Sequence, residues 1–158
     1  LFIHSIIPII KENKNLYIVC AGGGKFNQKE KSMFDNLNIA NKLIFHNIND
    51  TILSYLYQKA IMFVFPSLYE GFGIPILEAL NCDCPCALSD TSSLPEIGGP
   101  AAVYFDPNSK ESIYNVINDL YKNKDKRDEL VSLGKIQRKK FSWANTATKT
   151  LSVYKKVI

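Results

Sequence analysis

The most constraining feature of the sequence is a short strand that is apolar on both faces and leads through a turn into a helix. The run Ile61-Met62-Phe63-Val64-Phe65 contains no polar residue. Such a run predicts a fully buried strand, and strands of this kind belong to parallel sheets that helices cover. The turn contains Gly71 and Gly73, and Pro75 suits the first position of the helix that follows. This unit already predicts an α/β fold.

The rest of the chain alternates in the same way. Further strands are predicted at 16–21, 43–45, 86–88 and 102–105, and further helices at 1–12, 27–36, 50–58, 109–122, 125–140 and 142–157. This alternation predicts βαβ units, and hence a Rossmann-like parallel sheet with helices on both faces. A chain of 158 residues without an internal linker or repeat fits one domain with its own core. We therefore predict a single domain over residues 1–158.

Two glutamates flank the glycine-containing turn. Glu70 precedes it, and Glu78 follows eight positions later, in the predicted first turn of the helix. Glycines permit close approach of the backbone, and the free N–H groups of a helix start favour an anion such as a phosphate. Two carboxylates beside a phosphate cradle suit a ligand with hydroxyls on both sides of a diphosphate. A nucleotide-sugar is such a ligand.

The whole segment from Pro66 to Leu80 resembles the Glu-(seven residues)-Glu signature of retaining glycosyltransferases of the GT-B fold, family 4. Five other segments resemble that family in the same order and at similar spacing: 16–24, 53–60, 92–96, 105–107 and 141–143. The resemblance covers nearly the whole chain. It implies the C-terminal, donor-binding half of a GT-B fold, with the first strand of its sheet missing.

The resemblance also implies roles for individual residues. Glu70 would contact hydroxyls of the donor sugar and help to stabilise charge as the glycosidic bond breaks, and Glu78 would accept both ribose hydroxyls. Four residues would offer backbone N–H groups to the sugar and the diphosphate: Gly71, Phe72, Gly73 and Ile74. Ile48 would meet the nucleotide base through backbone contacts.

Each of these roles has a plainer alternative. Glu70 could be a solvated loop carboxylate, and Glu78 could serve only the dipole of its helix. For Ile48, an ordinary apolar anchor in a loop is equally open. The motif as a whole favours the functional interpretation of the two glutamates.

The resemblance further implies that part of the site lies outside this chain. In the family, a strand followed by an arginine and a lysine that hold the diphosphate comes before the point where this sequence begins. The chain starts with Leu1 and not with Met, so we expect the true N-terminus, together with an acceptor-binding domain, upstream. A saccharide or a lipid-linked acceptor would bind there, and the chain alone would have negligible activity.

Neither a metal nor another cofactor is expected. Cys82, Cys84 and Cys86 alternate, which places successive side chains on opposite faces of an extended segment, whereas zinc ligands are usually spaced differently. We predict small buried thiols in a reducing cytoplasm. The sequence offers no Asp-x-Asp triplet as a metal site, and the resemblance implies metal-free transfer from a UDP- or GDP-sugar.

Composition leaves the partner class broad. The formal charge of +4 is modest, no apolar run reaches the length of a membrane span, and a nucleic-acid partner is not predicted. The resemblance implies a cytoplasmic hexosyltransferase of bacterial cell-surface polysaccharide synthesis, with peripheral contact at the inner face of the membrane left open. One alternative is a non-catalytic nucleotide-sugar-binding module. Another is a nicotinamide-dependent oxidoreductase, which is disfavoured because Asn27 stands where the third glycine of that fingerprint belongs.

Overall fold

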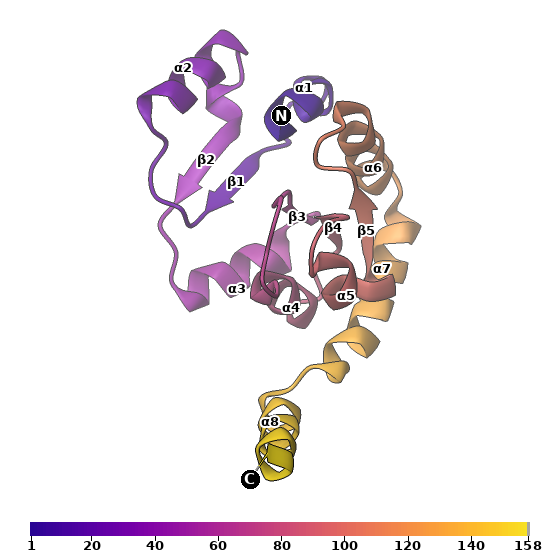
Figure 1. Ribbon diagram of the computed structural model, residues 1–158. Coiled ribbons are helices and arrows are strands. Elements are labelled where there is room, and N and C mark those ends of the chain that lie inside the picture. The colour runs from indigo at the N-terminus through magenta and orange to yellow at the C-terminus, as the bar shows by residue number, and fades with distance from the viewer. Residues whose placement is uncertain (158) are drawn as a thin grey trace.

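The computed structural model describes residues 1–157 and confirms the α/β fold (Figure 1). The strands of this part of the chain are β1 (Ile18–Ala21), β2 (Leu43–His46), β3 (Phe63–Phe65), β4 (Cys86–Ser89) and β5 (Ala102–Phe105). Its helices are α1 (Phe2–Glu12), α2 (Gln28–Asn36), α3 (Asp50–Lys59), α4 (Ile74–Asn81), α5 (Leu94–Gly98), α6 (Lys110–Lys122), α7 (Lys124–Gln137) and α8 (Trp143–Val157). Each predicted strand and helix is present, with ends that differ by a few residues.

Side-chain caps fix where several helices begin. Asn27 accepts a hydrogen bond from the Glu30 N–H at 3.0 Å while the Glu30 carboxylate accepts from the Asn27 N–H at 2.7 Å, a capping box at the start of α2. Asn49 caps α3 by accepting from the Ile52 N–H at 2.9 Å. The strand predicted from Ile61 begins only at Phe63, whose N–H donates to the Pro85 carbonyl at 2.8 Å as β3 meets β4.

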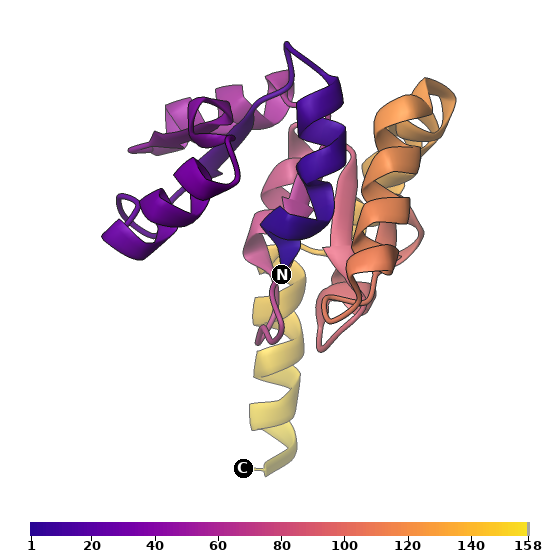
Figure 2. The same cartoon turned by 90° about the horizontal axis from the view of Figure 1, so that it is seen from above.

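All strand pairs are parallel. β1 pairs with β2, with Ile18 opposite Leu43, and β3, β4 and β5 form a second sheet in that order. Helices α1 and α6 pack against each other in one apolar cluster, and α3, α4 and α5 contribute to another with β3 and β4. Figure 2 shows α1 between the β1–β2 unit and α6. The predicted cover of helices on both faces is confirmed.

A cavity of about 770 Å³ lies between β1 of one sheet and β3 of the other. Its lining is mainly apolar and includes all of β1 and β3, with α1 and α3 contributing from the helical layers. In a Rossmann sheet with strand order 3-2-1-4-5-6, the first strand lies between the second and the fourth. If β1 is the second strand and β3 the fourth, this cavity has the position of the strand that the sequence predicts to be missing.

The last helix stands away from the rest of the fold. None of the residues of α8 is buried, and Trp143 at its start is 84% exposed. Figure 1 shows α8 extending beyond α4 and α5, on the far side from α1. Its apolar side chains therefore remain exposed and are not packed into the core formed by the rest of residues 1–157.

Candidate functional site

The turn between β3 and α4 has the backbone shape that the sequence predicts. Gly73 caps α4 with φ +108°, in the left-handed region, and a Cβ there would lie 3.0 Å from Cδ1 of Ile76 and 3.2 Å from Cδ2 of Leu94. Both the dihedral angle and the crowding therefore require glycine. None of the N–H groups of Gly71, Phe72 and Gly73 donates a hydrogen bond within residues 1–157. They remain available to a ligand.

Replacing Gly73 by alanine tests this geometry. A left-handed φ costs an L-residue about 1–2 kcal/mol, and the contacts with Ile76 and Leu94 add to that. We expect Gly73→Ala to lower the free energy of unfolding by about 2 kcal/mol, measured by urea denaturation. Gly71→Ala is the matched control, because a Cβ at Gly71 meets nothing within 4 Å. Equal stability of the two variants would contradict the prediction.

Glu70 lies in the middle of this turn and is half-buried. Its carboxylate has no hydrogen-bond or ion-pair partner within residues 1–157, whereas its backbone carbonyl accepts from Ser92 Oγ at 2.7 Å and from Ser93 Oγ at 3.0 Å. The backbone is thus held while the acidic group stays unpaired. Such an arrangement leaves the carboxylate free to accept hydrogen bonds from hydroxyl groups of a ligand.

The prediction that Glu78 lies in the first turn of its helix is wrong. α4 begins at Ile74, one residue earlier than predicted, because the left-handed Gly73 turns the chain directly into the helix. Glu78 is therefore in the second turn, where interaction with the helix dipole is weaker. Its Oε2 instead accepts a hydrogen bond from the Tyr57 hydroxyl of α3 at 3.3 Å.

Tyr57 is a residue of the site that the sequence analysis missed. Its side chain is only 7% exposed, and burial, followed by the negative charge of Glu78, raises the pKa of its hydroxyl. The phenol therefore stays protonated at neutral pH and donates to Glu78. In the sequence, Tyr57 looks like one more apolar residue on the inner side of α3. Because a buried tyrosine hydroxyl usually has a hydrogen-bond partner, its hydroxyl group was the signal that could have identified it.

Removing the hydroxyl should loosen the orientation of Glu78 without disturbing the packing of the ring. If Glu78 binds the ribose as the sequence analysis predicts, Tyr57→Phe should weaken nucleotide binding about tenfold, the loss typical of one hydrogen bond to a charged group. Isothermal titration calorimetry on the full-length protein measures it. The control is Tyr55→Phe on the same helix, since Tyr55 is exposed. The same affinity in both variants would show that Tyr57 does not orient Glu78.

The structure brings part of the predicted site together. Ile48, Tyr57, Pro75 and Glu78 all line the 770 Å³ cavity. Glu70, Gly71, Phe72, Gly73 and Ile74 do not line it. Phe72 packs edge-on against Phe141, with ring centroids 6.0 Å apart.

The cysteines form no metal site with other residues of the described chain, where no three histidine, cysteine or acidic side chains converge. Cys84 and Cys86 are buried. Burial raises the pKa of Cys84 to about 12 and also raises that of Cys86, so both are thiols at neutral pH.

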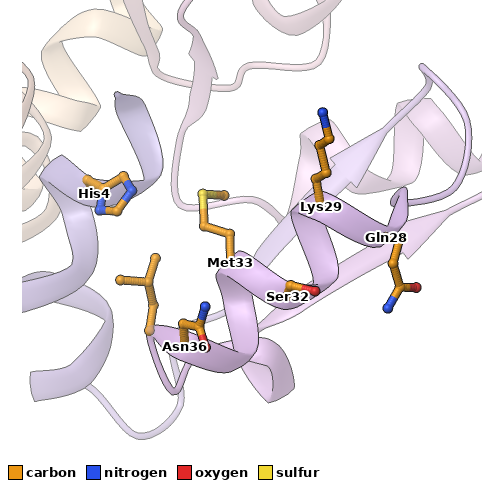
Figure 3. A pocket seen from close by; sticks show the side chains of 7 residues that line it. His4, Gln28, Lys29, Ser32, Met33 and Asn36 are labelled. Carbon is orange, nitrogen blue, oxygen red and sulfur yellow. The ribbon is translucent and has the colours of Figure 1, made fainter.

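A second hollow of about 470 Å³ lies between α1 and α2 (Figure 3). Its lining comprises His4, Gln28, Lys29, Ser32, Met33, Asn36 and Leu37. Figure 3 shows Gln28 and Lys29 extending away from the other side chains, so its polar groups do not converge on one point. It contains none of the predicted site residues.

No helix within residues 1–157 has both the length and the apolar character of a membrane span.

The chain is similar to known proteins over most of its length. Residues 3–137 match the model of the family described as Glycosyl transferases group 1. The chain is 43% identical over 108 residues to O-antigen chain mannosyltransferase B of Escherichia coli, covering 68% of this chain and 28% of that protein. It is 33% identical over 122 residues to O-antigen chain mannosyltransferase RfbU of Salmonella typhimurium, covering 75% and 34%. The chain thus spans about a third of the length of these relatives.

The fold is shared with more distant proteins. The structure of Staphylococcus aureus TarM, solved with fondaparinux, α-GlcNAc-glycerol and UDP, superposes with a TM-score of 0.83 at 18% identity, over 96% of this chain and 31% of that one. At this identity the likeness concerns the fold, which is that of the GT-B glycosyltransferases. Because the family model matches most of the sequence, the chain belongs to the glycosyl transferases group 1 family.

Proposed function

We propose that this chain is the donor-binding domain of a retaining glycosyltransferase that transfers mannose from a nucleotide-sugar in the synthesis of a bacterial surface polysaccharide. The observation that carries the proposal is the arrangement around α4. Along the chain, the unpaired N–H groups of Gly71, Phe72 and Gly73 follow a free carboxylate, Glu70, and precede a carboxylate held by Tyr57, Glu78. The names of the relatives support mannose as the sugar.

Each end of a nucleotide-sugar has a partner in this arrangement. The Glu70 carboxylate accepts hydrogen bonds from sugar hydroxyls, and the amide groups of the turn receive the negative charge that grows on the leaving diphosphate. Beyond the carboxyl end of β2, the Ile48 backbone meets the base, and Glu78 on α4 accepts both ribose hydroxyls. The arginine and lysine expected upstream would complete the diphosphate site. The reaction would need no metal, since these groups supply the positive potential.

The acceptor is bound elsewhere in this proposal. A saccharide or lipid-linked acceptor would lie on an N-terminal domain outside this chain, with the reaction in the cleft between the domains. The 158 residues alone would accordingly lack transferase activity. A site at the inner face of the membrane would suit a lipid-linked acceptor, and the formal charge of +4 would favour such contact.

A binding and turnover experiment tests the proposal. The full-length protein is titrated with GDP, UDP and NAD by thermal shift, because a ligand that binds only the native state raises the unfolding temperature. We expect stabilisation by one nucleoside diphosphate and mannosyl transfer from the corresponding sugar nucleotide, with the anomeric configuration retained. Stabilisation by NAD alone would refute the proposal. Stabilisation by a nucleoside diphosphate without transfer to any saccharide or lipid-linked acceptor would favour the non-catalytic binding module.

A further inference from the structure

The loop after β4 reaches across to the turn that carries Glu70. Ser92 Oγ donates to the Glu70 carbonyl at 2.7 Å, and Ser93 Oγ lies 2.8 Å from the Phe72 carbonyl and 3.0 Å from that of Glu70. Further back on the same connection, Thr91 Oγ1 donates to the Ser67 carbonyl at 3.4 Å. Three consecutive hydroxyl groups after β4 thus hydrogen-bond backbone carbonyls of the neighbouring turn after β3.

Two hydroxyl protons are available for two carbonyl groups. A serine hydroxyl has a single donor hydrogen, so Ser93 cannot donate fully to both Glu70 and Phe72. The shorter distance assigns Ser93 to Phe72 and leaves Ser92 for Glu70. Both serines are therefore needed to hold both carbonyls, because Ser93, which reaches either of them, can donate fully to only one at a time.

Fixing these carbonyls also fixes the amide groups on the other side of the same peptide planes. The peptide unit is planar and trans, so the N–H of residue i+1 points opposite to the carbonyl of residue i. The carbonyls of Glu70 and Phe72 turn toward the serines, and the N–H groups of Gly71 and Gly73 consequently point away from them. These are two of the amides that donate to no group within residues 1–157.

Ser92 adopts a backbone conformation that supports a specific role. Its φ is +56°, in the left-handed region that serine rarely occupies. Such a conformation persists only where the surroundings hold it in place, and the 2.7 Å hydrogen bond to Glu70 is one such restraint. The side chain is directed at the turn although the residue itself is exposed.

We propose that Ser92 and Ser93 are positioning residues for sugar transfer, which hold the Glu70 carboxylate and the Gly71 and Gly73 amides in their reactive orientation. This inference rests on the function proposed above. It places the hydroxyls behind the reacting groups, where they act through the backbone and touch neither the sugar nor the diphosphate.

The test uses Ser92→Ala, Ser93→Ala and the double variant in the full-length protein. We expect a roughly tenfold loss of kcat in each single variant and about a hundredfold loss in the double variant, with the donor KM changed less than threefold. Amide hydrogen exchange of residues 70–74 should become faster. Ser93→Thr, which keeps the hydroxyl, should restore kcat. Ser132→Ala is the matched control, since its hydroxyl also donates to a backbone carbonyl, that of Asp128 at 3.0 Å, but on α7.

Two results would overturn the inference. Unchanged hydrogen exchange in the double variant would mean that the hydroxyls do not hold the turn. Faster exchange with an unchanged kcat would mean that holding the turn does not serve transfer. A fully active Glu70→Gln variant would instead refute the role of Glu70 in the proposed function, and the exchange measurement would still decide whether the serines fix the backbone.

Discussion

Glu70→Gln in the full-length protein is expected to lower kcat for sugar transfer by about 10²–10³-fold. The reason is electrostatic: a carboxylate without a protein partner precedes the amide groups that we propose receive the diphosphate, and glutamine of the same shape carries no charge. Nucleotide affinity should change little, because the proposed function assigns Glu70 to the sugar and Glu78 and Ile48 to the nucleoside. Steady-state kinetics with the sugar nucleotide, together with titration of the nucleoside diphosphate alone, separates the two effects.

The control for this prediction is Glu129→Gln. Glu129 is exposed on α7 and takes part in none of the ion pairs of the described chain. Its replacement should leave kcat within twofold of the original. If Glu70→Gln behaves like Glu129→Gln, Glu70 is a solvated loop residue and its assignment to the sugar is wrong.

An added strand between β1 and β3 is expected to raise the free energy of unfolding of the 158-residue chain by about 3 kcal/mol or more. A five-residue apolar strand joined by a short turn to Leu1 can enter the cavity parallel to both neighbours, because α1 then forms a right-handed crossover to β1. Each apolar side chain buried there contributes about 1.5–3 kcal/mol, which exceeds the ordering cost of a short segment once its backbone also pairs on both sides.

Urea denaturation measures this gain, and the m-value provides a second readout, since it rises with the surface that unfolding exposes. The control carries a strand of equal length with aspartate at the inward positions. Equal stability of the apolar and acidic versions would mean that the cavity between the sheets is not a strand position. Stabilisation by the apolar version alone would support a strand position between β1 and β3 that joins the two sheets into one.

Much of the fold could be predicted because its signals are local. The apolar run of β3 and the glycine turn before α4 each depend on residues close together in the sequence. Two boundaries were predicted wrongly. β3 begins only at Phe63, where pairing with the β4 connection starts, and the left-handed backbone of Gly73 starts α4 at Ile74, which places Glu78 in the second turn.

The candidate site was only half predictable for the same reason. Glu70 and Glu78 lie in one motif, so the sequence could single them out together, and the roles assigned to them remain predictions. Their supports come from distant segments: Tyr57 is 21 residues before Glu78, and Ser92 is 22 residues after Glu70. No local pattern relates these positions.

The sequence by itself determined the alternation of parallel strands and helices and the position of a two-glutamate motif at a strand end. Only the tertiary structure decided which side chains hold that motif, and that the strands divide into two sheets around a cavity. The physical reason is that periodicity and turn chemistry act over a few residues. Contacts between Tyr57 and Glu78, or between Ser92 and Glu70, exist only once the helices pack and the carboxyl ends of β3 and β4 lie side by side.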